Sequence, residues 1–287
     1  ITFDLIDVPP PYANALRRTL LVNVPAVAIE IIGVLDNTSV MTDEVLCHRI
    51  GLIPINVDPD LLKMPTEPVT DTSNDPSTVL LFGLHVIGGE GPTELSGDAD
   101  YTHEGSLPPV YTGPSGEVTS KHIVWLPFPG QEGFNAHPLY DNIPITKLNQ
   151  GQAIHLYARA VKGTGADHAK FSPVCTAFYR YVPSVKVDSS IPSELMPKLA
   201  EVCAPGVFDI EESGQLTAIH ERKCTTCREC IRDQELAKYV SLGKLKNRYE
   251  FTVETVGVIP VEKIVTNAFR ILRDRCEEMR EAVKDAL

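Results

Sequence analysis

The residues with the clearest chemical potential in this chain are four cysteines in its C-terminal third. Cys224, Cys227 and Cys230 form a C-x2-C-x2-C run, and Cys203 lies 21 residues upstream, close to Pro205. Thiolates at two-residue gaps can surround a compact multi-iron cluster, and a distant cysteine near a proline can supply the fourth ligand. Nearby basic side chains would offset the negative charge of the thiolates: Arg222, Lys223 and Arg228. The spacing therefore favours an iron–sulfur cluster.

Other states of these cysteines stay open at this point. Structural zinc also takes four cysteines, although its ligands usually come in two separated pairs rather than one triplet. A disulfide is disfavoured in a reducing compartment, and four unliganded buried thiols are a further possibility. The chain has seven cysteines, an odd number, which argues against a secreted disulfide scaffold. Three cysteines are isolated in apolar settings and indicate core packing: Cys47, Cys175 and Cys276.

The elements that must position these residues follow from hydrophobic periodicity, which predicts an α+β fold. We expect strands at residues 2–6, 27–35 and 247–256, and helices at residues 12–22 and 261–283. Pro25 follows the first of these helices and Pro260 suits the first turn of the second. The final helix carries an apolar stripe that one domain cannot cover alone, so we expect both terminal helices to pack against a partner. The residues predicted at that interface are Leu16, Leu20, Ile264, Ala268, Ile271, Leu272 and Met279.

Two adjacent arginines, Arg17 and Arg18, are unusual on the otherwise apolar first helix. A solvated helix face is the simplest interpretation. A further helix is predicted to begin near Thr42, because Asp43 and Glu44 would lie against its positive N-terminal end.

Composition narrows the class of protein. The formal net charge of −12 over 287 residues argues against a broad nucleic-acid surface, which needs a basic stripe. No run of 18 apolar residues indicates a membrane span, and no signal peptide is visible at Ile1. Since residue 1 is not Met, we expect the natural chain to begin upstream. Residues 58–120 carry eleven acidic residues against one lysine, and we interpret them as an acidic, loop-rich insertion with a short strand at 79–86.

No combination of residues predicts catalysis. The eight histidines are scattered without metal-ligand spacing. The glycine-rich residues 88–92 lack the lysine and hydroxyl residue of a phosphate-binding loop. Residues 162–165 lack the third glycine of a dinucleotide-binding turn and are interpreted as a hairpin turn. Asp167 beside His168 is better explained as a polar turn than as an acid–base pair.

Several segments, taken together, resemble the α-like assembly subunit of multisubunit RNA polymerases. They are N-A-L-R-R at 14–18, D-E-V-L-C-H-R-I-G-L-I-P at 43–54, H-A-K-F-S-P at 168–173 and F-T-V-E-T-V-G-V-I-P at 251–260. The segment around Trp125 is similar to the form shared by eukaryotic RNA polymerases I and III. The absence of cysteine between Cys47 and Cys175 agrees, since the related RNA polymerase II subunit carries a zinc loop there. The resemblance covers nearly the whole chain and is weakest at 58–120.

The resemblance implies a fold of the RNA polymerase α-N-terminal-domain type with two insertions. Residues 1–39 and 238–287 would form the dimerisation domain. Residues 40–186 would form an inserted β-rich domain that contains the acidic part at 58–120. Residues 187–237 would form a ferredoxin-like insertion, in which Cys203, Cys224, Cys227 and Cys230 match the family's ligands for a 4Fe-4S or 3Fe-4S cluster. Ala204, between Cys203 and Pro205, departs from that pattern, and zinc is the alternative.

The function implied by the resemblance is that of a non-catalytic scaffold of DNA-directed RNA polymerases I and III, which transcribe rRNA and small RNAs. The chain would heterodimerise with a small α-like subunit and dock the second-largest subunit and other polymerase subunits. It would lie in the nucleus, including the nucleolus, without membrane contact or sequence-specific nucleic-acid binding. The alternatives are an archaeal D-type subunit and an iron–sulfur electron-transfer protein. By resemblance, the residues that dock the large subunit are Arg17, Arg18, Asp43, Glu44, His48 and Arg49.

Overall fold

The structure, a computed structural model, divides the chain into two compact units. Unit 1 consists of residues 1–17 and 178–252, and unit 2 of residues 18–177 and 253–287. The boundary falls inside three elements, which are α1 (Pro10–Val22), β12 (Val174–Val187) and β15 (Val240–Thr255). The described residues are all those of the chain except 90–93, 97–109, 115, 212–213 and 286–287.

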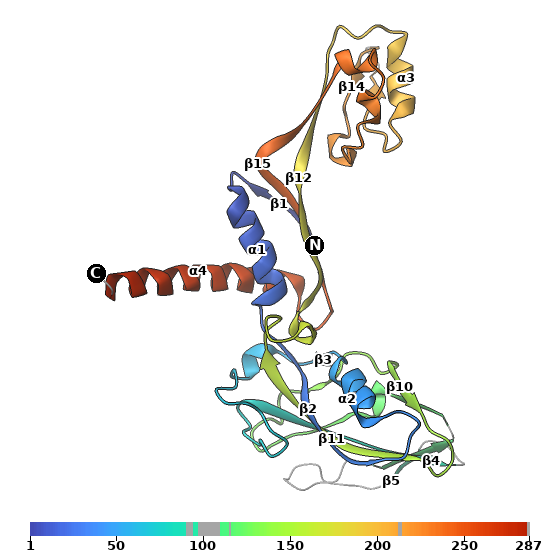
Figure 1. The fold of residues 1–287 in the computed structure, drawn as a ribbon, viewed down its shortest axis with the longest axis vertical. Helices are drawn as coiled ribbons and strands as arrows, with labels where there is room; N and C mark the ends of the chain where they lie inside the picture. Colours follow the sequence, from blue (N-terminus) through green and yellow to red (C-terminus); the bar gives the residue numbers. More distant parts are fainter. Residues whose placement is uncertain (90–93, 97–109, 115, 212–213, 286–287) are drawn as a thin grey trace. The chain divides into compact units, whose positions relative to one another are not determined.

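A three-stranded sheet forms the base of unit 1, with the strand order β1-β15-β12 (Figure 1). The strand β1 (Thr2–Ile6) pairs antiparallel with β15, so Phe3 lies opposite Phe251 and their rings stack 5.2 Å apart. Tyr249 and Phe251 are fully buried, because alternate residues of a strand face the same side. The predicted strands at 2–6 and 247–256 are confirmed, although β15 begins earlier, at Val240.

The cysteine segment, residues 188–239, lies between β12 and β15 in unit 1. It holds α3 (Leu195–Val202), the hairpin of β13 (Asp209–Ile210) with β14 (Leu216–Thr217), and three 3-10 turns. Those turns are η4 (Glu221–Lys223), η5 (Glu229–Ile231) and η6 (Leu236–Lys238). The small core of the cysteine segment contains Leu199, Val207, Leu216, Leu236 and Cys230, and Cys203 and Cys224 pack against this core.

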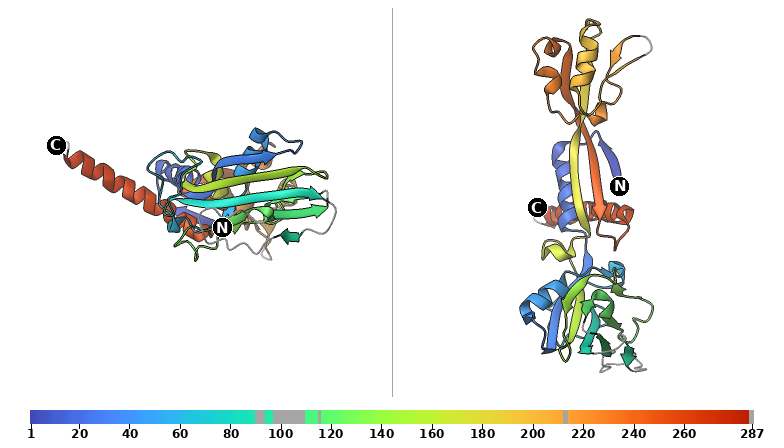
Figure 2. Two further views of the ribbon diagram at one scale, coloured as in Figure 1. Left: turned by 90° about the horizontal axis from the view of Figure 1, so that it is seen from below. Right: turned by 90° about the vertical axis from the view of Figure 1, so that its right-hand side faces the viewer.

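A six-stranded sheet forms the centre of unit 2. Its order is β2-β11-β4-β6-β5, and β8 pairs with β4; among the described residues of the sheet, β4 and β6 are the pair that runs parallel. The left view of Figure 2 shows these strands lying in one layer. The strands are β2 (Ala26–Asn37), β4 (Val79–Gly89), β5 (Glu94–Ser96), β6 (Val110–Pro114), β8 (Val124–Leu126) and β11 (Ala153–Gly163). Two short pairs accompany the sheet, β3 (Ile55–Asn56) with β9 (His137–Pro138) and β7 (Glu117–Thr119) with β10 (Pro144–Lys147).

Two helices of unit 2 matter for the site. The helix α2 (Asp43–Gly51) buries Leu46 and Ile50 in the core beneath the sheet, together with Ile29, Phe82 and Leu156. The helix α4 (Val261–Asp285) buries Ile264 and Ala268 near its start. Among the described residues, no helix has both the length and the apolar character that crossing a membrane requires.

The strand predicted at 27–35 is confirmed as part of β2, which lies in the unit 2 sheet. Ten residues of β2 pair with β11, with two register shifts, and the pairing begins at Ala26 opposite Gly163. An apolar strand buried on one face satisfies either sheet, so only the long-range pairing decides its place. The strand β12 joins β15 in the three-stranded sheet.

The short strand predicted at 79–86, within the acidic residues 58–120, is confirmed as β4, which continues to Gly89. The strand β4 is central in the unit 2 sheet, and Leu80, Phe82 and Leu84 are completely buried. Alternating apolar residues decide this part of the segment, and their burial outweighs the effect of the acidic neighbours. Residues 90–93, 97–109 and 115 of this prediction lie outside the described residues.

Candidate cysteine site and partner surfaces

The four predicted ligand cysteines line one small cavity in unit 1. Cys203 ends α3, Cys224 follows η4, Cys227 lies in the loop between η4 and η5, and Cys230 lies within η5. The local chain bends tightly at this point: Gly206 has a φ of +67° after the first cysteine. The fold therefore brings together residues that the sequence separates.

The loop between Cys224 and Cys230 turns around the cavity, and two of its residues have left-handed backbone conformations. Thr226 has a φ of +58° and Arg228 a φ of +68°, a conformation that costs energy for residues with a Cβ. The backbone N–H of Thr226 donates to the Sγ of Cys224 at 3.4 Å. Such an N–H···S contact stabilises negative charge on the sulfur.

Burial raises the pKa of the Cys230 thiol to about 11, and negative charge on Cys203, Cys224 and Cys227 adds to the shift. The Cys230 thiol therefore stays protonated at neutral pH unless a cationic group compensates the charge of its thiolate. All seven cysteines of the chain are free thiols, with no disulfide.

Four cysteines are the donor set of either an iron–sulfur cluster or a structural zinc ion. Tetrahedral zinc holds sulfurs at about 2.3 Å, which brings them to within about 4 Å of one another. Among the described residues, no three His, Cys, Asp or Glu side chains lie close enough together to hold one metal ion. The cavity is about 10 Å³, room for about one water molecule.

The neighbouring basic residues were expected to offset thiolate charge, and the structure separates their roles. Arg228 lines the cysteine cavity. Arg222 instead forms ion pairs with Asp4 and Glu250 of the unit 1 sheet. Lys223 is exposed, and its backbone N–H donates to the His220 carbonyl at 2.9 Å.

The predicted docking residues fall into two groups. Arg49 donates from Nε to the Ile145 carbonyl at 3.0 Å and from Nη2 to the Pro144 carbonyl at 2.8 Å, so it fastens α2 to β10. Asp43 accepts from the Asn37 side chain at 2.6 Å. Both residues are therefore engaged within the chain.

Arg17 is also engaged, because its guanidinium donates to the Asn14 side chain at 3.0 and 3.1 Å. The remaining predicted docking residues, Arg18, Glu44 and His48, are exposed. Val45 and Leu52, each half exposed on the same short helix and its end, add apolar surface beside His48.

A cavity of about 220 Å³ lies beside α2, between the helix, β2 and the 3-10 turn η3 (Ala169–Phe171). Lys170 reaches across it, donating to the Ile29 carbonyl at 2.7 Å and pairing with Glu30 at 2.5 Å. The His168 side chain accepts from the Lys170 backbone and caps the turn. The sequence predicted a polar turn at Asp167 and His168 but gave no role to Lys170.

The residues predicted at the dimer interface fall into a buried group and a more exposed group. Leu16, Leu20, Ile264 and Ala268 are at most 1% exposed, so they pack inside the chain. Ile271 and Leu272 are half-buried, and Met279 is 71% exposed. The physical reason is that the apolar residues of these helices cover two faces, one turned inward and one outward.

The outward face of α4 follows a seven-residue repeat. Phe269, which the prediction missed, and Val283, which it placed on the apolar stripe, are exposed and continue the repeat. The spacing of three and four residues is typical of a helix that packs against another helix. The side chains on this outward stripe are Phe269, Leu272, Cys276, Met279 and Val283.

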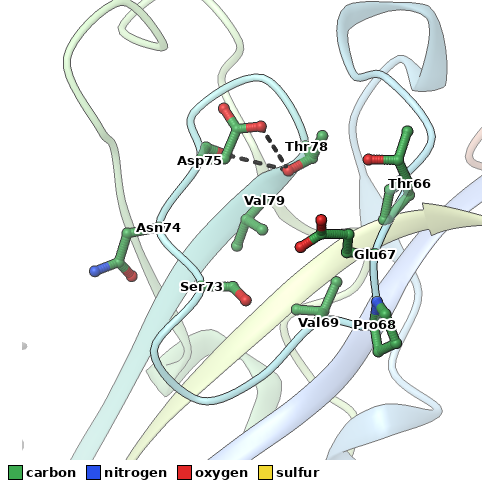
Figure 3. A pocket seen from close by; sticks show the side chains of 10 residues that line it. Thr66, Glu67, Pro68, Val69, Ser73, Asn74, Asp75, Thr78 and Val79 are labelled. Carbon is green, nitrogen blue, oxygen red and sulfur yellow. Dashed lines mark hydrogen bonds between the residues drawn. The ribbon is translucent and has the colours of Figure 1, made fainter.

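Figure 3 shows a second cavity of about 220 Å³, under the loop that precedes β4. Its polar groups satisfy one another: Asp75 accepts from the Ser77 backbone and from the hydroxyls of Ser77 and Thr78. Arg159 holds the loop by donating to the Ser73 carbonyl at 2.9 Å. The cavity is a consequence of loop anchoring and shows no unsatisfied group aimed at a ligand.

Comparison with known proteins places these features in context. The family model described as the RNA polymerase Rpb3/Rpb11 dimerisation domain matches residues 2–276. The chain is 36% identical to "DNA-directed RNA polymerases I and III subunit rpac1" of Dictyostelium discoideum, over 99% of this chain and 78% of that protein. The human subunit RPAC1 is 35% identical, over 96% of this chain and 79% of that protein. The archaeal "DNA-directed RNA polymerase subunit Rpo3" of Methanobrevibacter smithii is 27% identical, over 98% of this chain and 90% of that protein.

Proposed function

The chain belongs to the RNA polymerase Rpb3/Rpb11 dimerisation-domain family, and from this premise we infer that it is a non-catalytic assembly subunit of DNA-directed RNA polymerases I and III. The observation that carries the inference is the match over almost the whole chain to subunits of those two enzymes. Its role is to bring other subunits together rather than to react with substrate.

The polymerase I and III form is favoured over the archaeal one. Relatives named for polymerases I and III are 35–36% identical to this chain, whereas the archaeal Rpo3 of Methanobrevibacter smithii is 27% identical. The chain is accordingly nuclear. Since polymerase I transcribes rRNA, we place the chain in the nucleolus as well.

The first partner is a small α-like subunit, and we assign its contact to the outward stripe of α4. Phe269, Met279 and Val283 are 46%, 71% and 58% exposed, which is costly for apolar groups left in water. A partner helix with apolar residues at the same spacing would bury them.

The second partner is the second-largest polymerase subunit. We assign its docking to the exposed side chains of Arg18, Glu44 and His48, with Val45 and Leu52 adding apolar area. Arg18 suits an assembly surface, because its planar guanidinium makes paired hydrogen bonds to carboxylates and carbonyls. Arg49 shapes this surface indirectly by fixing α2.

We also propose that Cys203, Cys224, Cys227 and Cys230 hold a 4Fe-4S or 3Fe-4S cluster. Their shared cavity and the left-handed loop residues Thr226 and Arg228 support this proposal. A bound cluster would cross-link the end of α3 to the loop between η4 and η5. Its role in this reading is structural.

The test of the assembly function is purification of the tagged chain from its own cells, followed by mass spectrometry. We expect the small α-like subunit and the second-largest subunits of polymerases I and III in near-equal amounts. Recovery of polymerase II subunits alone would overturn the assignment. Met279→Asp is a matched variant, because it should lose the small subunit while the chain stays folded.

A further inference from the structure

Two carboxylates face each other in the sheet of unit 1. Asp4 in β1 lies directly opposite Glu250 in β15, and their side chains are only 17% and 13% exposed. Like charges directly opposite on neighbouring strands repel each other, and burial strengthens the repulsion. The pairing of β1 with β15 therefore requires positive charge at this point.

Arg222 supplies positive charge to both carboxylates at once. Its Nη1 and Nη2 donate to the two oxygens of Asp4 at 3.0 and 2.5 Å. The same Nη1 lies 3.3 Å from Glu250. A forked contact of this kind fixes geometry as well as charge. Arg222 is 218 residues away from Asp4 in sequence.

Two further arginines complete the group, but each serves mainly one carboxylate. Arg248 of β15 donates to Asp4 at 3.0 Å, and Arg180 of β12 donates to Glu250 at 2.7 and 3.0 Å. Arg180 also donates to the backbone carbonyl of Arg222 at 2.9 Å. Both the backbone and the side chain of Arg222 are thus tied to the sheet.

Arg222 belongs to the cysteine segment, not to the sheet. It lies in the single turn η4, which is closed by the Cys224 N–H donating to the Glu221 carbonyl at 3.0 Å. Only one residue separates it from Cys224. Any loosening of the cysteine loop must therefore displace the guanidinium that bridges Asp4 and Glu250.

We propose that Arg222 is a positioning residue that couples order in the cysteine segment to the pairing of β1 with β15. When the cysteine loop is ordered, Arg222 holds the first strand of the chain at the edge of the sheet. When the loop loosens, the two carboxylates lose their shared counter-charge and β1 separates from β15. This coupling follows from contacts within unit 1 and does not depend on the identity of the partner subunits.

The coupling reaches the element that follows β1. The backbone N–H of Val8 donates to the Asn247 carbonyl at 3.3 Å, just before α1 begins at Pro10. A five-residue strand near the start of a chain frays readily unless it is tied down. Loosening of the cysteine segment therefore also loosens the backbone at the start of α1.

Hydrogen–deuterium exchange on the full chain, bound to its small partner, tests the proposal. In Arg222→Ala, amides of residues 2–6 should exchange at least tenfold faster than in the unchanged chain. Lys223→Ala is the matched control, since it removes an adjacent exposed positive charge. Unchanged exchange of residues 2–6 in Arg222→Ala, or an equal rise in Lys223→Ala, would overturn the proposal.

Further variants distinguish a loss of this coupling from simple misfolding. Asp4→Asn removes one of the two opposed charges, so the double variant Arg222→Ala/Asp4→Asn should recover most of the lost protection. Coupling is reciprocal, so Asp4→Asn alone should speed exchange at residues 221–227. Cys227→Ser should speed exchange at residues 2–6 as well as in its own loop. If Cys227→Ser loosens only its own loop, the segment and the sheet are independent and the proposal fails.

Discussion

His85 of β4 and His155 of β11 lie directly opposite each other in the unit 2 sheet, and their rings stack with centroids 4.3 Å apart. Burial lowers the pKa of both imidazoles, and repulsion from His155 lowers that of His85 further. Asp36, opposite His155 on β2, acts in the other direction on both. The pair is therefore held neutral in the folded chain at neutral pH.

The first prediction is a loss of stability in weak acid. A histidine whose folded pKa lies below its unfolded value of about 6.5 favours the folded state fully above that pH. This contribution is lost as the pH falls below about 6.5 towards the folded pKa values, because the unfolded chain takes up protons first. The urea midpoint of the chain should fall between pH 7.5 and 5.5. His155→Gln should flatten this dependence, and an unchanged dependence in that variant would contradict the prediction.

The second prediction concerns Gly165, where a Cβ would overlap the backbone carbonyl oxygen of Leu21 at the end of α1. Neighbouring Ala166 donates its N–H to the Val22 carbonyl at 3.1 Å, so the loop caps the helix and cannot easily withdraw. Gly165→Ala should destabilise the chain by about 1–3 kcal/mol. Gly33→Ala in β2 is the control, since no atom lies within 4 Å of its added Cβ. Equal thermal midpoints for the two variants would contradict this account.

These two sites illustrate what the sequence could and could not predict. The K-G-T-G segment was interpreted as a hairpin turn, but the strands before and after it, β11 and β12, belong to different sheets, and its close approach to α1 depends on long-range packing. Likewise, the cysteine spacing predicted that four thiols converge, because the pattern itself is local. The partner of Arg222 is 218 residues distant, so no spacing could indicate it.

Burial was the quantity that periodicity predicted least well. The stripe on α4 was identified correctly as apolar, yet Ile264 and Ala268 turn inward while Met279 turns outward. A helical repeat identifies apolar faces but does not state which one the chain itself covers. Similarly, Arg49 was grouped with the docking residues, although its guanidinium already donates hydrogen bonds to two β10 carbonyls.

The third prediction separates the roles of two arginines. Arg49→Ala should destabilise the isolated chain by about 1–3 kcal/mol, because it leaves two carbonyls of β10 without their donor. Arg18→Ala should leave the thermal midpoint within experimental error, because its side chain is exposed. In reconstitution with purified subunits, Arg18→Ala should weaken recruitment of the second-largest subunit while the small subunit stays bound. Loss of the small subunit first would show that Arg18 belongs to the dimer interface.

The fourth prediction concerns the outward stripe of α4. Leu272→Asp or Met279→Asp should weaken binding of the small α-like subunit at least tenfold, because a carboxylate would be buried without a partner. Helix content by circular dichroism should be nearly unchanged. Glu281→Lys changes charge away from the stripe and serves as the control. Titration by analytical ultracentrifugation gives the affinities, and unaltered binding by Met279→Asp would exclude this stripe.

The last prediction concerns the cysteine cavity. Cys230 titrates with a pKa of about 11 because of burial and its three sulfur neighbours, so a bound cationic group must displace its proton. Chain purified without oxygen should be brown and contain iron and acid-labile sulfide. Cys227→Ser should lose both, while Cys175→Ser, an exposed cysteine in β12, should retain them. Zinc in a one-to-one ratio without sulfide would overturn the cluster assignment.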